Sequence, residues 1–302
     1  MPMKPIRIGT RGSPLALAQT QEVITALDPT LKNRIQIVPV KTTGDTLVDR
    51  CLTDMGGKSL FTKEIEEALL EGRIDLAVHS MKDVTVYSPD GLIFPAILKR
   101  EDARDAVITR GGLSLEALPP GSLFGTSSLR RQAHLLHHYP HLRVMPLRGN
   151  VETRLKKIET GEMAGTLLAV AGLKRLGILE KATYILEIDD CLPAIAQGAI
   201  GIQCRDGDKE MLALLSPLNH LPTFQAVTAE RAFMRTLHGS CRTPMAAYGE
   251  IQGDMLIFKG MVCDSNGTNM RFVDHQGLAI QAAMIGEEAA KRLQESACGT
   301  SF

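Results

Sequence analysis

The segment Ile74–Val84 constrains the fold of this chain more than any other. Its apolar residues between Ile74 and Val78 follow Gly72 as a short run that is typical of a buried strand. His79-Ser80-Met81-Lys82-Asp83 then stands where that strand ends, and in an open α/β sheet ligands bind at the carboxyl ends of strands. The Asp83 carboxylate is therefore a candidate to hold a ring N–H group or to stabilise a developing cation. The alternative is that Asp83 is a turn or helix-cap residue paired with Lys82.

Strand and helix patterns alternate around this segment. The pattern restarts after the charged stretch 99–105, and the small, isoleucine-rich segment 193–202 is expected to return the chain to its first domain. Two crossings between two α/β halves predict a hinged pair of lobes, as in periplasmic binding proteins. The expected strands are 6–9, 35–40, 106–109, 123–125, 142–147 and 166–171, and the expected helices are 15–27, 61–71, 129–138 and one capped by Asn150.

The pattern changes beyond residue 217. A helix at 226–237 precedes strand-like runs at 244–251, 255–263 and 270–274 and a closing helix at 278–295. These elements predict a small α+β domain with a three-stranded antiparallel sheet. The fold class is therefore α/β, with two lobes joined by a double crossover and this additional domain. The expected boundaries are 1–99 with 198–217 for the first domain, 100–197 for the second and 218–302 for the third.

The charge and cysteine content exclude several classes of protein. Lys plus Arg and Asp plus Glu both number 34, so the net charge is zero and a general attraction to nucleic acid or membrane is not expected. The six cysteines show neither zinc-ligand spacing nor a disulfide pattern. No apolar run reaches membrane-spanning length, and the first residues lack the apolar core of a signal peptide. We expect a cytoplasmic protein without a metal site.

Two helix starts carry groups that suit an anion. Arg11 and Ser13 precede the helix at 15–27, and Ser128 opens the helix that carries Arg130 and Arg131. An arginine at a helix N-terminus opposes the helix dipole unless an anion is bound there, which indicates a ligand. Between residues 126 and 158, seven basic residues stand against one acid. With Tyr139 as the only aromatic residue there, a small polyanion is favoured over nucleic acid. Ordinary helix caps and solvated arginines are the alternative.

Two loops contain further candidate residues. Cys241 lies in a polar loop beside Arg242, where exposure and a neighbouring cation favour the thiolate, although an incidental surface thiol fits equally. Cys191, Cys204 and Cys263 stand in apolar runs and are expected in the core. The run Gly56-Gly57-Lys58 suits a mobile flap over a site or an ordinary surface loop.

Together these motifs resemble porphobilinogen deaminase (hydroxymethylbilane synthase) along essentially the whole chain. One local departure is Ser240, where many members of that family have glycine before the cysteine. The segments that carry the resemblance are Gly9-Thr10-Arg11-Gly12-Ser13-Pro14-Leu15-Ala16-Leu17, Gly56-Gly57-Lys58-Ser59-Leu60-Phe61, Val78-His79-Ser80-Met81-Lys82-Asp83, Gly125-Thr126-Ser127-Ser128-Leu129-Arg130-Arg131, Leu147-Arg148-Gly149-Asn150, and Cys241 with Pro244.

The resemblance implies a three-domain, monomeric enzyme and a specific chemistry. It implies a dipyrromethane cofactor bound to Cys241 through a thioether. It also implies condensation of four porphobilinogen molecules with loss of ammonia, followed by hydrolytic release of hydroxymethylbilane. Asp83 is the implied catalytic residue. The residues implied to contact the cofactor are Lys82, Asp83, Ser128, Arg130 and Arg131. The residues implied to bind substrate are Arg11, Ser13, Thr126, Arg148, Arg154, Arg175 and Gln197. The flap would include Lys58 and Phe61.

Two other classes of function remain open from the residues alone. A ligand-binding module without chemistry explains the lobes and the arginines but gives Cys241 and Asp83 no role. A hydrolase or transferase with a cysteine nucleophile needs a histidine base, for which His79 and His238 are available. Nothing in the sequence orients either histidine.

Overall fold

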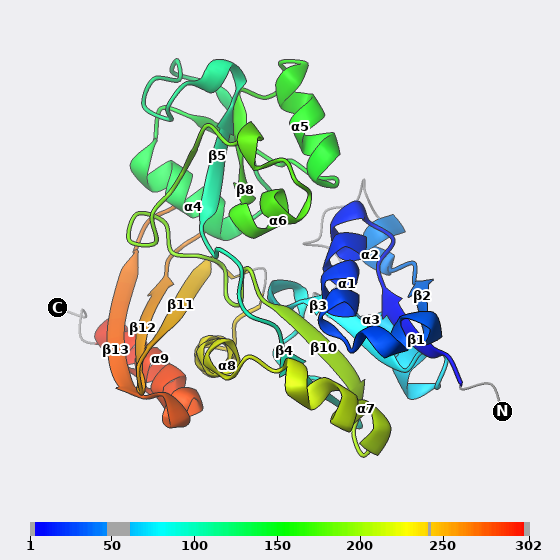
Figure 1. Cartoon of the computed structure of the whole chain (residues 1–302). Coiled ribbons are helices and arrows are strands. Elements are labelled where there is room, and N and C mark those ends of the chain that lie inside the picture. The colour runs from blue at the N-terminus through cyan, green and yellow to red at the C-terminus, as the bar shows by residue number, and fades with distance from the viewer. Residues whose placement is uncertain (1–3, 47–60, 241–242, 299–302) are drawn as a thin grey trace. The chain divides into compact units, whose positions relative to one another are not determined.

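The computed structural model describes residues 4–46, 61–240 and 243–298. The chain forms two compact units (Figure 1). Unit 1 comprises Met1–Glu101 and Gly198–Phe224, and unit 2 comprises Asp102–Gln197 and Gln225–Phe302. The chain thus leaves unit 1 after residue 101 and returns to it at residue 198, close to the two crossings that the sequence predicts.

Unit 1 is built on a five-stranded sheet in the order β2-β1-β3-β10-β4. Strand β1 pairs in parallel with β2 and β3, whereas β10 is antiparallel to both β3 and β4. Apolar side chains such as Ile8, Leu76 and Ile202 are fully buried in its core. The strands are β1 (Ile6–Thr10), β2 (Ile35–Pro39), β3 (Leu76–Ser80), β4 (Leu92–Ile97) and β10 (Ile200–Arg205), and the helices are α1 (Pro14–Ala26), α2 (Thr43–Thr46), α3 (Lys63–Leu70) and α7 (Lys209–Leu215).

Unit 2 contains a second five-stranded sheet and a three-stranded antiparallel sheet. The five-stranded sheet has the order β7-β6-β8-β5-β9 and the smaller sheet has the order β11-β12-β13. These three sheets confirm the predicted fold class. The strands are β5 (Asp105–Thr109), β6 (Leu123–Gly125), β7 (Arg143–Met145), β8 (Gly165–Ala169), β9 (Tyr184–Ile185), β11 (Met245–Gln252), β12 (Met255–Val262) and β13 (Arg271–Leu278). The helices are α4 (Leu129–His138), α5 (Val151–Glu159), α6 (Val170–Arg175), α8 (Leu221–Thr236) and α9 (Ala282–Cys298). The first residues of α8, up to Phe224, belong to unit 1.

Local capping signals place several helices where the sequence predicts them. Ser13 caps α1 with Pro14 at the first helical position, and its Oγ accepts a hydrogen bond from Ala16 N. Asn150 Oδ1 likewise accepts a hydrogen bond from Thr153 N at the start of α5. Helix α4 has the predicted bounds. These ends are determined by side chains within a few residues of each helix start.

Several predicted boundaries are wrong. The helix expected at 226–237 begins five residues earlier, at Leu221. The strand expected to reach residue 171 ends at Ala169, where α6 begins. The strand expected at 142–147 is shorter and spans only β7. The third strand of the small sheet runs to Leu278 and displaces the start of the closing helix, because β13 pairs with β12 from Arg271 to Leu278. Strands β4 and β9 were not predicted at all.

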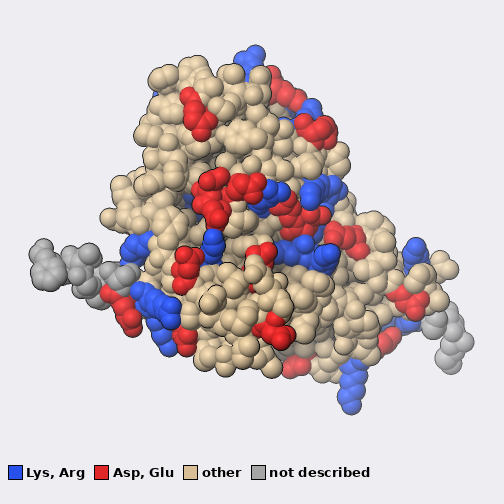
Figure 2. All heavy atoms as spheres, turned by 60° about the vertical axis from the view of Figure 1, so that its left-hand side comes forward, with Lys and Arg blue, Asp and Glu red and all other residues tan. Residues whose placement is uncertain are grey.

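No described helix could span a membrane, and the one face shown in Figure 2 has no broad basic patch. Within residues 4–46, 61–240 and 243–298, the helices are too short or too polar to cross a bilayer. On the face shown in Figure 2, acidic and basic side chains are interspersed.

Candidate functional site

In unit 1, a cavity with both polar and apolar lining residues lies at the end of strand β3. A single 3₁₀ turn, Met81–Asp83, follows β3 and brings Lys82 and Asp83 to the cavity wall. Buried Met81 anchors this turn, and Val84 N donates a hydrogen bond to Met81 O. The cavity is lined by Arg11, Ser13, Leu15, Ala16, Gln19, Phe61, Thr62, Ile65, Val78, His79, Ser80, Lys82 and Asp83. Five residues singled out from the sequence, Arg11, Ser13, Phe61, Lys82 and Asp83, thus line one cavity.

The Asp83 carboxylate is available to a ligand. Its side chain is half-buried and makes no hydrogen bond or ion pair with the described residues. The pairing with Lys82 that the sequence left open is therefore not formed. A carboxylate that lies in a cavity wall without a partner can accept N–H donors or face a positive charge.

Arg11 and Phe61 also meet at this cavity. The Arg11 guanidinium carbon lies 4.3 Å from the centre of the Phe61 ring, which is a cation–π contact. Ser13 uses its hydroxyl oxygen as the cap of α1, and the hydroxyl proton remains a possible donor. The cap and the cation–π contact hold these side chains at the cavity rim.

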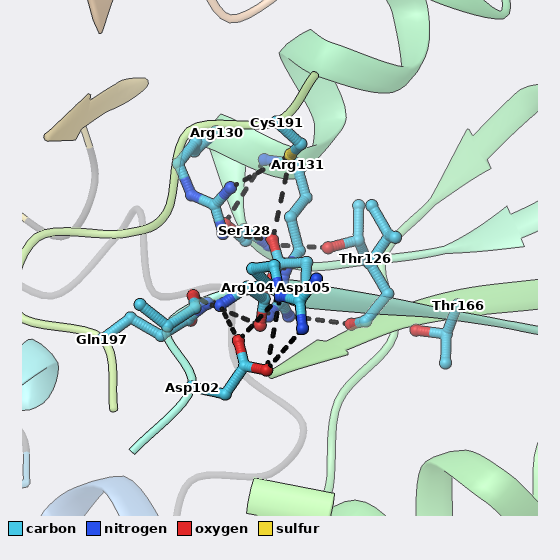
Figure 3. A network of polar contacts seen from close by, with 12 residues as sticks. Asp102, Arg104, Asp105, Thr126, Ser128, Arg130, Arg131, Thr166, Cys191 and Gln197 are labelled. Carbon is cyan, nitrogen blue, oxygen red and sulfur yellow. Dashed lines mark hydrogen bonds and ion pairs between the residues drawn. The ribbon is translucent and has the colours of Figure 1, made fainter. Parts of the chain in front are cut away.

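In unit 2, Arg130 and Arg131 surround a buried carboxylate (Figure 3). Asp105, the first residue of β5, is fully buried and accepts hydrogen bonds from Arg130 Nη2 at 2.6 Å and Arg131 Nη2 at 2.7 Å. Arg131 Nε, at 3.2 Å, completes a bidentate fork. Both arginines lie in the first turn of α4, where the helix dipole is unfavourable for positive charge. The nearby negative charge of Asp105 offsets this unfavourable interaction. The chain thus supplies one anion itself, so the position of these arginines at the helix start does not by itself require a bound ligand.

Burial and charge act in opposite directions on this carboxyl. Burial alone would raise the pKa of Asp105, but the charges and hydrogen bonds of Arg130 and Arg131 hold that pKa well below its usual range. Asp105, Arg130 and Arg131 form a cluster of two guanidinium groups and one carboxylate, which has a net positive charge. Arg130 Nε is buried and has no hydrogen-bond partner among the described residues. The cluster therefore retains capacity for a further anion.

Of the other predicted residues of unit 2, Gln197 and Arg154 donate side-chain hydrogen bonds to backbone carbonyl groups. Gln197 is almost fully buried, and its Nε2 donates hydrogen bonds to Ala103 O at 2.7 Å and Asp105 Oδ1 at 2.8 Å. These two bonds let Gln197 hold Asp105 in place. The Ser128 N–H donates to Thr126 Oγ1 at 3.2 Å, and Ser128 caps α4. Arg148, Arg154 and Arg175 are half-buried, and Arg154 Nε donates to Gly149 O at 2.9 Å.

The structure describes Cys191, Cys204 and Cys263 but not Cys241. Cys241 and Lys58 lie outside the described residues. Cys191 and Cys204 are buried as predicted, with Cys191 Sγ 3.4 Å from Arg130 Nη1. Cys263 is only partly buried and packs against a small core cluster that contains Leu192, Ala246 and Met261. Within the described part of the chain, no cluster of His, Cys, Asp or Glu is arranged to hold a metal ion.

The role of Asp105 was not predicted from the sequence. The available signal was an acid directly before a buried apolar strand, in a chain whose following segment carries an excess of arginine. Glu66 and Gln203, which are buried polar residues of unit 1, were not predicted from the sequence either. Such residues need partners, which only the packed structure can identify.

Comparison with known proteins identifies the family. The family model "Porphobilinogen deaminase, dipyromethane cofactor binding domain" matches residues 6–213, and "Porphobilinogen deaminase, C-terminal domain" matches residues 224–295. The chain belongs to the porphobilinogen deaminase family. Porphobilinogen deaminase of Nitrobacter winogradskyi is 50% identical, with 96% of this chain and 93% of that protein covered. The chloroplastic porphobilinogen deaminase of Oryza sativa subsp. japonica is also 50% identical, with 97% and 84% covered.

More distant members and folds are also similar to this chain. Porphobilinogen deaminase of Paracoccus denitrificans is 45% identical over 100% of this chain and 97% of its own length. Among solved structures, a Salmonella typhimurium periplasmic binding protein with high arginine specificity matches with a TM-score of 0.42 and 14% identity, covering 72% of this chain and 92% of that one.

Proposed function

We propose that this porphobilinogen deaminase family member condenses four porphobilinogen molecules with release of ammonia and then releases hydroxymethylbilane by hydrolysis. The observation that carries the proposal is the Asp83 carboxylate, which has no partner among the described residues and lines one cavity with Arg11 and Lys82. Each porphobilinogen molecule brings carboxylates, a pyrrole N–H group and an aminomethyl group. The cavity offers a matching group to each of them.

Asp83 acts on the charge that develops during deamination. Loss of ammonia from the protonated aminomethyl group leaves a cationic azafulvene, and a carboxylate fixed beside it lowers the barrier to that loss. Arg11 and Lys82 bind carboxylates of the substrate and of the growing chain. Arg148, Arg154 and Arg175 in unit 2, together with Thr126, extend the set of substrate-binding groups, and Ser13 and Gln197 complete it. Lys58 and Phe61 belong to the flap of this site.

The arginine cluster fits the carboxylates of a dipyrromethane. The net positive charge around Asp105 and the buried, unpartnered Arg130 Nε support binding of an anion there. Arg130, Arg131 and Ser128 hold the cofactor carboxylates in unit 2, and Lys82 does so in unit 1. When bound through a thioether to Cys241, the dipyrromethane supplies the pyrrole carbon to which the first substrate is joined.

The same proposal includes three domains, a cytoplasmic location and a monomeric state. The domains are 1–99 with 198–217, 100–197 and 218–302. The described cysteines Cys191, Cys204 and Cys263 are free thiols, which is what a reducing compartment favours.

The intact mass of the protein tests the proposal. Protein made in cells supplied with porphobilinogen should be heavier than its sequence by two pyrrole units after loss of two ammonia molecules, and the increment should survive acid because a thioether is covalent. Cys241→Ser should lack the increment, whereas the control Cys263→Ser should keep it. Purified protein should also consume porphobilinogen and release ammonia. A wild-type protein with only its sequence mass and no such activity would contradict the proposal and favour a binding module.

A further inference from the structure

Among the titratable residues that line the cavity, which are Arg11, His79, Lys82 and Asp83, the proposed mechanism gives no role to His79. It is the fourth residue of β3, and its register partner on the neighbouring strand β10 is Gly201. His79 Nε2 lies 3.0 Å from Oε1 of Gln203, which also belongs to β10. A carbonyl oxygen only accepts hydrogen bonds, so the proton of the imidazole resides on Nε2. The hydrogen bond to Gln203 thereby orients a ring that the sequence could not orient.

The Gln203 amide is itself oriented by its surroundings. Its Nε2 lies on the side of the Glu66 carboxyl, and the buried Nε2 and Glu66 Oε1 both lack a formed hydrogen bond among the described residues. An amide turned the other way would point its carbonyl oxygen at this carboxyl, which is unfavourable for both oxygens while Glu66 is ionised. Oε1 therefore faces His79.

The second ring nitrogen of His79 is left for the cavity. Nδ1 makes no hydrogen bond with the described residues, and the ring lines the same cavity as Asp83. The ring is held at its edge by Phe94, whose centre lies 5.7 Å away at an interplanar angle of 66°. Burial lowers the pKa of His79 to about 4, which keeps the imidazole neutral at pH 7. Nδ1 thus presents a fixed, uncharged lone pair.

We propose that His79 Nδ1 is a substrate-binding group that accepts a hydrogen bond from an N–H donor of porphobilinogen beside Asp83. This inference rests on the proposed function. The two acceptors have different roles. The Asp83 carboxylate stabilises positive charge, whereas the neutral His79 Nδ1 orients an N–H group of the substrate without adding charge. The donor is either the pyrrole N–H or the aminomethyl group. No proton is transferred in this role.

Nuclear magnetic resonance of the holoenzyme labelled with ¹⁵N-histidine tests the inference directly. His79→Phe identifies the His79 signals by their absence, and Asp83→Asn slows turnover during the measurement. We expect the Nε2–H tautomer in the free protein and a change of the Nδ1 resonance when porphobilinogen is added. An analogue with hydroxymethyl in place of aminomethyl distinguishes the donors: a shift with both ligands identifies the pyrrole N–H, and a shift with porphobilinogen alone identifies the amine.

Kinetics provide a second readout. Because a hydrogen bond to a neutral group contributes about a factor of ten, His79→Phe should raise KM for porphobilinogen about tenfold. Gln203→Leu should raise it less and allow both tautomers in the spectrum, because only the orientation is lost. The control His275→Phe removes a histidine that pairs with Glu288 in unit 2 and should leave KM unchanged.

The experiments distinguish failure of the His79 inference from failure of the proposed function. An unchanged Nδ1 resonance on addition of porphobilinogen, or the Nδ1–H tautomer in the free protein, would overturn the role of His79 while leaving the proposed function intact. Wild-type protein that neither carries the mass increment nor consumes porphobilinogen would overturn the proposed function itself.

Discussion

Replacing Asp105 by asparagine should destabilise unit 2 strongly. The carboxylate is fully buried and accepts hydrogen bonds from Arg130 Nη2, from Arg131 Nε and Nη2, and from Gln197 Nε2. Asparagine keeps one oxygen but removes the charge, so two buried guanidinium groups lose their counterion. Removal of one partner of a buried ion pair costs about 3–5 kcal/mol. Since asparagine retains one acceptor, we expect the lower value, about 3 kcal/mol, or roughly two orders of magnitude in the opening equilibrium.

Hydrogen exchange followed by mass spectrometry measures this loss locally. Peptides that cover β5 and α4 should lose protection, whereas peptides from β1 and β3 in unit 1 serve as internal controls. The matched variant is Asp189→Asn, because Asp189 is 75% exposed and pairs with Lys259 on the surface. That variant should change the free energy of opening by less than about 1 kcal/mol.

The effect should depend on pH in a defined direction. The pKa of Asp105 in the folded protein lies below its usual value, so its contribution to stability is present above the unfolded pKa of about 3.9 and declines as the pH falls below it. The difference between wild type and Asp105→Asn should therefore be constant from about pH 5 to 8 and shrink below about pH 4. Equal protection of the two proteins at pH 7, or a difference that grows on acidification, would refute the assignment of Asp105 as the counterion.

Three further predictions concern other parts of the chain. Asp83→Asn should keep the cofactor mass increment but lower kcat by about 10²–10³; turnover close to that of wild type would remove Asp83 from the mechanism. Burial raises the pKa of Glu66, so its contribution to stability is lost as the pH rises above its unfolded value. Glu66→Gln should therefore be stabilised relative to wild type at pH 8 but not at pH 4, as measured by urea unfolding of unit 1. Gly286→Ala would place a methyl group against the Ala229 carbonyl oxygen, where α9 crosses α8, and should cost about 1–3 kcal/mol in thermal unfolding despite the better helix propensity of alanine. A raised melting temperature would show that the two helices can separate slightly.

Much of the local structure could be predicted because its causes are local. Ser13 and Pro14 start α1, Asn150 starts α5, and the apolar run before His79 forms β3. The family resemblance also follows from the sequence, since it depends on the order of several motifs. The predictions failed where pairing with a distant strand decides the outcome, as in β13, whose length is set by its register with β12.

The sequence by itself determined the caps, most strands and helices, the three-sheet architecture and the family. It identified the arginines as charges in need of an anion, but it could not say which anion, because Asp105 lies 25 residues before Arg130 along the chain and meets it only in the folded unit. The tertiary structure likewise decided the orientation of His79, since Gln203 is 124 residues away and reaches it only because β10 runs antiparallel to β3. Local propensity acts over a few residues, whereas burial forces distant polar groups to find partners, and those partners define the chemistry of the site.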